Sequence, residues 1–164
     1  MVTMPRDQKG FSLIELLIVV AIILVIAAIA IPSLLRSRMA ANQASAIESM
    51  RVLGTSEVAF SATYGIGYSA TLYALGPPAA GALATSAAAG LIDDLLANGA
   101  KSGYTFVYTP TLLDNSGRYN GYTIVANPTE VGITGNNYYY TDQTHVIRMN
   151  TVSQAGSTDS PVAQ

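Results

Sequence analysis

The dominant pattern in the sequence is an apolar run close to the N-terminus. Every residue in 16–31 is apolar, and the run extends back to Phe11 with only Ser12 and Glu15 as polar interruptions. A helix rises about 1.5 Å per residue, so a run of this length spans roughly 30 Å, the thickness of the hydrocarbon core of a bilayer. The pattern therefore predicts a membrane-spanning helix over residues 11–32.

After Pro32 the pattern becomes amphipathic. Larger apolar residues recur at near-helical spacing, with small residues between them: Leu35, Met39, Ile47, Met50, Leu53 and Val58. We expect the helix to continue over residues 33–64, with its apolar face carrying a globular part. The stretch 64–69 contains two glycines, which favour the end of the helix near Thr63.

The remainder, residues 65–164, shows short runs separated by turn residues. Apolar spacing predicts a short helix at about 91–98, and β-rich runs predict four strands at about 104–109, 121–126, 137–141 and 145–149. We interpret 70–90 as an irregular loop and 154–164 as a loose tail. The predicted fold class is α+β, with the long helix packed on a four-stranded antiparallel sheet.

The amino-acid composition limits the classes of function that the protein can have. Only 11% of residues are charged, far below the roughly 25% that is usual for soluble domains. Such a surface suits a protein that packs against copies of itself or lies outside the cell. The net charge of −2 gives no general attraction to nucleic acid, so no such partner is expected. The absence of cysteine excludes disulfides, thiolate metal sites and a cysteine nucleophile.

Candidate chemical sites are few. His145 is the one histidine, and the sequence contains no nucleotide-binding fingerprint or Ser/His/Asp set, so we expect neither an enzyme nor a cofactor. Oxygen ligands for calcium are present, but no loop has the dense spacing of a calcium site, and a metal is not expected. These candidate ligands are Asp114, Asn115, Asp142 and Asp159.

Glu15 is the residue of the apolar run that needs an explanation. An acidic residue costs about 2.5–3.5 kcal/mol at the centre of a bilayer on insertion scales, and less near an end. Glu15 could stay hydrated at the interface, could belong to a transport relay, or could await a cationic partner created by processing or assembly. One helix cannot build a transport pathway, and the neighbouring residues favour the third interpretation.

The head of the chain, residues 1–10, differs from an ordinary signal peptide. The apolar segment after it is longer than the usual 7–15 residues, and no small-residue cleavage site follows. Positive residues are balanced across the segment, with Arg6 and Lys9 before it and Arg36 and Arg38 after it. Because the bulk of the chain lies C-terminal, we expect a single-pass protein with a cytoplasmic N-terminus.

The motif Lys9-Gly10-Phe11-Ser12-Leu13-Ile14-Glu15 resembles the N-terminal signal of type IV pilins and of the related pseudopilins of type II secretion. The resemblance continues through the apolar run and Pro32 to about Arg51. It implies that residues 1–10 are a leader, that a prepilin peptidase cuts between Gly10 and Phe11, and that the new α-amine of Phe11 is methylated. The hydrophobic helix would then remain in the mature protein.

The resemblance also implies roles in assembly. In a helical filament, the amine of Phe11 can reach Glu15 of a neighbouring subunit, which offsets the desolvation of both charges and sets the axial register. An intramolecular pair is the alternative, because the two residues are four apart. In the family the helix before this proline often loosens on assembly, helped by a glycine where this chain has Leu24, so the resemblance leaves both a loosened and an intact helix before Pro32 as alternatives.

The expected function is therefore a structural subunit of a type IV pilus, a helical homo-oligomer. It would be assembled from the inner membrane by the pilus machinery into a surface filament for adhesion, twitching motility or DNA uptake. Two alternatives remain: a pseudopilin of a type II secretion system, which acts in protein export, and a plain single-span membrane protein with a binding domain.

Overall fold

A computed structural model describes residues 10–162 of the chain. Its first element is helix α1, Leu13–Tyr64, which contains 52 residues and continues through Pro32. The structure separates into two compact units, one ending at Ser37 and one beginning at Arg38, so the boundary falls a few residues beyond Pro32. The predicted single long helix is confirmed, beginning two residues after Phe11.

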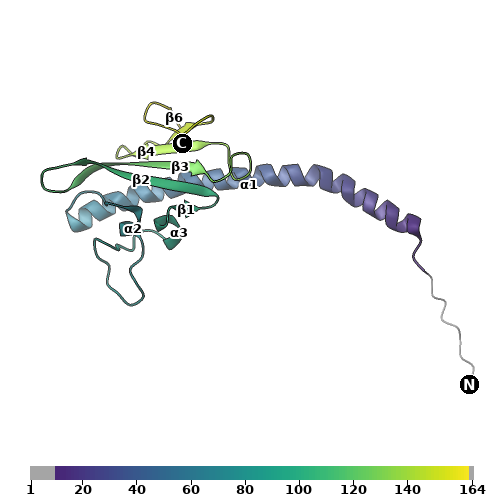
Figure 1. Cartoon of the computed structure of the whole chain (residues 1–164), viewed down its shortest axis with the longest axis horizontal. Helices are drawn as coiled ribbons and strands as arrows, with labels where there is room; N and C mark the ends of the chain where they lie inside the picture. The colour runs from purple at the N-terminus through teal and green to yellow at the C-terminus, as the bar shows by residue number, and fades with distance from the viewer. Residues whose placement is uncertain (1–9, 163–164) are drawn as a thin grey trace, which may run out of the picture. The chain divides into compact units, whose positions relative to one another are not determined.

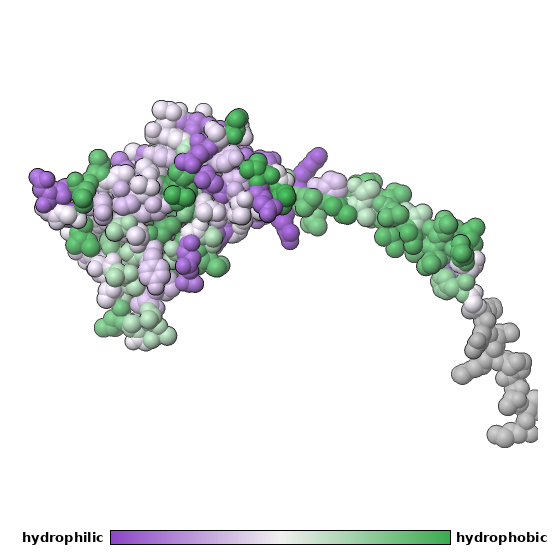
Figure 2. Space-filling model, viewed as in Figure 1, coloured by the Kyte–Doolittle hydropathy of each residue, from purple (hydrophilic) through white to green (hydrophobic). Residues whose placement is uncertain are grey.

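The unit that ends at Ser37 exposes its apolar side chains. All large apolar residues from Phe11 to Leu35 are exposed, and Figure 2 shows them as a green stretch of the helix. No part of the most apolar window of α1 is buried within the described chain, and the helix is long and apolar enough to cross a membrane. Water is a poor solvent for such a surface, so this half of α1 needs lipid or other protein around it.

The unit that begins at Arg38 contains a sheet whose strands follow one another in chain order, each antiparallel to its neighbour (Figure 1). The two long central strands, β2 and β3, pair from Tyr104 opposite Pro128 to Leu113 opposite Tyr119. The six strands are β1 Ala100–Lys101, β2 Tyr104–Leu113, β3 Tyr119–Pro128, β4 Tyr138–Asp142, β5 Arg148–Asn150 and β6 Ser160–Pro161.

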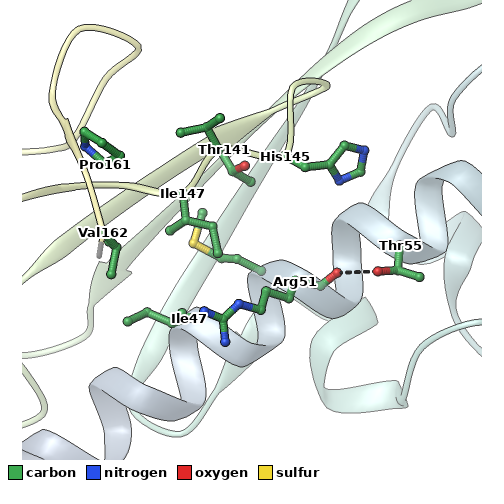
Figure 3. Close-up of a pocket in the computed structure, with 10 residues that line it drawn as sticks. Ile47, Arg51, Thr55, Thr141, His145, Ile147, Pro161 and Val162 are labelled. Carbon is green, nitrogen blue, oxygen red and sulfur yellow. Dashed lines mark hydrogen bonds between the residues drawn. The ribbon is translucent and has the colours of Figure 1, made fainter. Parts of the chain in front are cut away.

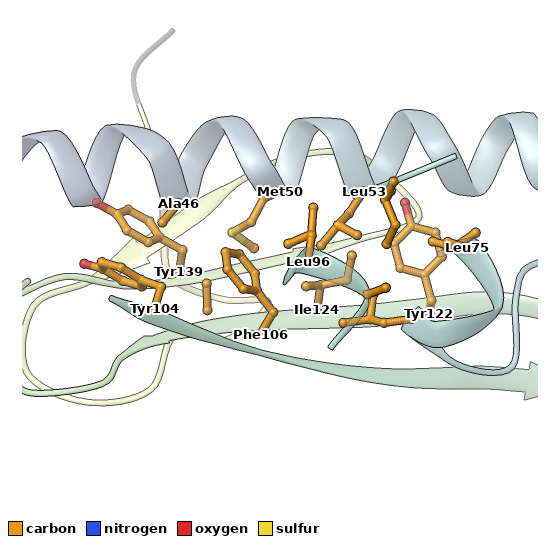
Figure 4. Packing of buried hydrophobic residues seen from close by; sticks show 14 of the residues in the cluster. Ala46, Met50, Leu53, Leu75, Leu96, Tyr104, Phe106, Tyr122, Ile124 and Tyr139 are labelled. Carbon is orange, nitrogen blue, oxygen red and sulfur yellow. The ribbon is translucent and has the colours of Figure 1, made fainter. Parts of the chain in front are cut away.

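The core of this unit lies between one face of the sheet and the C-terminal half of α1 (Figure 4). Successive residues of β2 alternate between the two faces, so Phe106 is buried whereas Val107 is 49% exposed. On β2 the outward-facing residues are thus open to solvent, whereas on β3 the cross-strand partner of Val107, Val125, is buried. The core side chains labelled in Figure 4 are Ala46, Met50, Leu53, Leu75, Leu96, Tyr104, Phe106, Tyr122, Ile124 and Tyr139.

The structure confirms the α+β fold but corrects the strand count from four to six. Strands β1 and β6 have two residues each, too few to produce a recognisable alternation in sequence. The strand predicted at 145–149 is observed as β5, Arg148–Asn150. It begins later because the carboxylate of Asp142 accepts hydrogen bonds from the amide and hydroxyl of Thr144, at 2.9 and 2.6 Å, and so prolongs the turn.

Two helices of four residues differ from the prediction. The helix predicted at 91–98 is observed as α3, Asp94–Ala97, because Asp93 caps it by accepting a hydrogen bond from the amide of Leu96. Helix α2, Leu72–Leu75, lies in the stretch predicted to be irregular, where Thr71 caps it. A helix of one turn is too short for a periodic pattern to reveal it.

Within the predicted loose tail, the described residues 154–162 contact the sheet. Ala155 is buried, and β6 extends the sheet by pairing Ser160 with Met149 of β5. The side chain of Arg148 donates a hydrogen bond of 2.8 Å to the carbonyl of Asp159. These contacts attach the C-terminal residues to the open edge of the sheet.

Candidate processing and assembly site

Gly10, Phe11 and Ser12 lie outside the helix, immediately before Leu13. All three are exposed, and the first turn of α1 begins with the carbonyl of Ser12, which accepts hydrogen bonds from the amides of Glu15 and Leu16 at 3.1 and 3.3 Å. The peptide bond predicted to be cut, between Gly10 and Phe11, is thus exposed non-helical backbone that a protease can bind. The rest of the predicted leader, residues 1–9, lies outside the described residues.

Packing against the part of the chain that the structure describes gives no reason for the glycine at position 10. A Cβ atom built on Gly10 would meet no described atom within 4 Å, and its φ is not in the left-handed region. Gly54 behaves differently, because a Cβ there would lie 2.6 Å from Nδ1 of His145. Packing against residues 10–162 therefore does not account for a glycine at position 10.

Glu15 lies in the first turn of α1 and is exposed. A carboxylate there is favoured by the helix dipole by about 0.3–1 kcal/mol, which is less than the roughly 2.5–3.5 kcal/mol that it would cost at the centre of a bilayer. Among residues 10–162 no salt bridge includes Glu15. Phe11 lies before the helix, so the intramolecular geometry expected for residues four apart on a helix is not present in the unprocessed chain.

Pro32 is accommodated inside α1, and the helix continues on both sides of it. Close after it, the hydroxyl of Ser37 donates a hydrogen bond of 3.1 Å to the carbonyl of Ser33. The alternative of a loosened helix before Pro32 concerns an assembled state, and the single chain is helical there, including at Leu24.

One face of the exposed half of α1 is hollowed. Apolar side chains at helical spacing surround a shallow groove of about 330 Å³ that has no polar surface: Leu17, Ile18, Ala21, Ile22, Val25 and Ile26. Ridges and grooves of this kind are what one helix presents to another in close packing.

The sequence did not reveal the buried carboxylate of Glu57. Glu57 is fully buried in α1 and accepts two hydrogen bonds from Ser69, from the amide at 2.9 Å and from the hydroxyl at 2.6 Å. Tyr108 of β2 donates to the carbonyl of Ser69 at 2.8 Å. Burial raises the pKa of Glu57, against the opposing effect of the bonds from Ser69. The available signal was its spacing, four residues after Leu53 and seven after Met50 on the predicted apolar face. Val58, which was predicted on that face, is instead 48% exposed.

A second feature that the sequence did not reveal is a pocket of about 460 Å³ between α1 and the C-terminal strands (Figure 3). Ile47, Arg51 and Thr55 line it from the helix, one turn apart, and Ile147 lines it from the opposite side. His145, predicted to lie at the surface, is exposed at its rim with a φ of 61°.

The candidate calcium ligands do not converge. Asp114 accepts hydrogen bonds from the amides of Ser116 and Arg118, and Asp159 accepts one from the amide of Gly156. Asp142 accepts a hydrogen bond from the amide of Thr144. Each of these three aspartates is therefore hydrogen-bonded within its own loop. Within the described part of the chain, no group of three or more His, Cys, Asp or Glu residues could hold a metal ion.

Comparison with known proteins gives a match to one family model and to relatives that share part of the chain. Residues 5–31 match the family model described as the prokaryotic N-terminal methylation motif. The chain is 62% identical over 37 residues to the type IV wide pilus major component PilA4 of Thermus thermophilus, covering 23% of this chain and 28% of that protein. It is 45% identical over 56 residues to the type IV major pilin protein PilA of Myxococcus xanthus, covering 34% and 25%.

The matches cover about a quarter of the length of each of these relatives. No solved structure matches the chain. The family model bears on residues 5–31, which include part of the predicted leader and the apolar run.

Proposed function

We propose that the protein is a structural subunit of a type IV pilus, because residues 5–31 match the N-terminal methylation motif and part of the chain is similar to two type IV pilins. The observation that carries the proposal is the exposed apolar half of α1, which begins with a methylation motif and is continuous with the helix that carries a compact sheet. Before assembly this apolar surface can lie in a bilayer, and after assembly it can be buried against the same surface of other subunits. The role that we propose for the protein is therefore structural and not catalytic.

Processing is the first step of the proposal. A prepilin peptidase cuts the exposed bond between Gly10 and Phe11, and the α-amine of Phe11 is then methylated. The absence of any packing reason for glycine at position 10 supports recognition of this residue by an enzyme. The membrane helix stays with the mature chain, because the cut lies before Leu13.

Assembly is the second step. In the filament, the amine of Phe11 of one subunit pairs with Glu15 of a neighbour, because two unpaired charges in an apolar core would be costly. The groove over residues 17–26 receives side chains of an adjacent helix. Pro32 is the position at which the helix can bend or unwind. The partners of the subunit are thus further copies, the peptidase and the pilus assembly machinery.

The proposed location follows from the same half of α1. Before assembly the subunit is a single-pass protein of the inner membrane with a cytoplasmic N-terminus, and after assembly it lies in a filament at the cell surface. The filament serves adhesion, twitching motility or DNA uptake, with no nucleic-acid contact proposed for the subunit itself. A pilus is favoured over a pseudopilus because both relatives carry pilus names.

The experiment is to express the chain in a host that supplies both a prepilin peptidase and a type IV pilus assembly machinery but lacks its own pilin, and to examine the product by mass spectrometry and electron microscopy. We expect an N-terminus at methylated Phe11 and filaments that contain the chain. Gly10→Val should block both, whereas Gly156→Val should not, because Gly156 is equally free of contacts. An intact leader in the presence of active peptidase would contradict the proposal, and processing without surface filaments would favour the pseudopilin.

A further inference from the structure

We infer that the loop between β3 and β4 of one subunit docks into the pocket beside Arg51 of the next subunit. The inference rests on the proposed filament and specifies one contact within it. The two surfaces are both part of the unit that begins at Arg38, and they differ in shape and in charge.

The pocket combines an apolar lining with one permanent positive charge. Ile47, Ile147 and Val162 form apolar walls, and the guanidinium of Arg51 lies among them (Figure 3). Among residues 10–162, the guanidinium of Arg51 has one ion-pair partner, Glu48 at 3.4 Å, and both side chains are more than half exposed, at 52% and 65%. An exposed pair of this kind contributes little stability, so Arg51 is available to a better-placed carboxylate.

The β3–β4 loop has complementary properties. It presents Glu130 together with the exposed apolar side chains of Val131 and Ile133, at 61% and 57% exposure. The loop is ordered by its own hydrogen bonds, since the carbonyl of Glu130 accepts from the amides of Ile133 and Thr134 at 3.2 and 2.9 Å. Two apolar side chains held beside one carboxylate match an apolar pocket that contains one guanidinium.

The positions of the two surfaces favour contact between subunits over contact within one. The loop is attached to α1 at Asn42, whose side-chain amide donates a hydrogen bond of 2.9 Å to the carbonyl of Thr134. Arg51 follows Asn42 by nine residues, which is two and a half helical turns, so the two lie on opposite sides of α1. A loop and a pocket on opposite sides give a heterologous contact, which repeats into an open helix when the rotation does not close.

Cysteine cross-linking tests the contact directly, because the natural chain has no cysteine. In a chain with both Val131→Cys and Thr55→Cys, mild oxidation of intact filaments should produce a ladder of covalent dimers, trimers and longer oligomers. The matched control joins Val131→Cys with Val107→Cys, since Val107 is exposed on the other face of the sheet. The inference would be overturned if filaments with Val131→Cys and Thr55→Cys produced no more covalent oligomers than the control filaments.

Charge exchange provides a second test that does not depend on cysteine variants assembling. Arg51→Glu and Glu130→Arg should each lower filament yield severalfold while the precursor accumulates in the membrane at the natural level, and the combination should restore the yield. Arg118→Glu, a change at an exposed arginine outside the pocket, should leave the yield unchanged. The contact would be contradicted if the single variants gave the natural filament yield, or if the double variant gave a yield as low as the single variants.

These outcomes are separate from the failure of the proposed function. If the natural chain forms no filaments when it is processed, the pilus assignment is wrong, and the docking contact is wrong with it. If the natural chain forms filaments but neither test behaves as described, the pilus assignment stands and the pocket has another occupant, such as a small carboxylate ligand.

Discussion

Replacement of Glu57 tests how the sheet-bearing unit is held together. The carboxylate is fully buried and accepts from the amide and the hydroxyl of Ser69, so it attaches the segment after α1 to the helix. In Glu57→Ala the hydroxyl of Ser69 keeps a partner, because it also contacts the carbonyl of Thr71 at 3.1 Å. The amide of Ser69 has no such alternative and is left buried without an acceptor.

The size of the effect follows from these contacts. A buried donor without a partner costs about 1–3 kcal/mol, and each buried methylene that is lost costs about 0.8 kcal/mol. We therefore expect Glu57→Ala to lower the free energy of unfolding by roughly 2–4 kcal/mol. Glu57→Gln keeps a carbonyl for the amide of Ser69 and buries no charge, so its cost at neutral pH should be below about 1 kcal/mol.

The pH dependence gives an independent check. Burial raises the pKa of Glu57 above its ordinary value of 4.5, so the folded chain keeps this proton to a higher pH than the unfolded chain does. Between the two pKa values the folded state binds more protons, and stability due to this group falls as pH rises through that interval. Glu57→Gln does not titrate and should lose this part of the pH dependence.

The assay is urea unfolding of the full chain in detergent, followed by tyrosine fluorescence at several pH values. Glu48, an exposed acid on the same helix, supplies matched controls, and Glu48→Ala and Glu48→Gln should each change stability by less than about 0.5 kcal/mol. The reasoning is refuted if Glu57→Ala is as stable as the natural chain, or if the glutamine variant is destabilised as much as the alanine variant.

Two further changes have defined outcomes. Glu15→Ala should leave membrane insertion intact and lower filament yield, which fractionation and electron microscopy measure, and an unchanged yield would contradict the proposed pairing with Phe11. Asp93→Ala removes the cap of α3 and the partner of Lys101 at 2.6 Å, and should cost about 0.5–2 kcal/mol in the same urea assay. Asp94→Ala is its control, since Asp94 lies inside the helix, and equal effects would refute the capping role.

Sequence reasoning predicted the features that depend on long periodic patterns. The helix over 13–64 and the central strands β2, β3 and β4 have enough residues for a pattern to be recognised. Strands β1 and β6 and helix α2 are too short for that, and they exist because neighbouring strands or a capping threonine complete their hydrogen bonds. The turn that delays β5 depends on which way the side chain of Asp142 points.

The candidate sites divide in the same way. The processing motif could be predicted because its residues are adjacent in sequence and its chemistry needs no fold. Glu57 and Ser69 are twelve residues apart, and Arg51 and Ile147 nearly a hundred, so only the folded chain brings them together. A charged residue on a predicted apolar stripe, as Glu57 is, was the one signal of a buried polar contact that the sequence contained.

The chain-order arrangement of the strands has a consequence for how the protein folds. Each strand pairs with the strand that precedes it, from β1 through β6, so little chain must be closed into a loop before a contact forms. Topologies with such local pairing fold faster than those built from distant strands. Residues 38–64 precede the sheet in the sequence. In a chain that leaves the membrane with its C-terminus last, this helical segment is therefore present before the strands and can act as a template for them. The strands can then add to it one hairpin at a time.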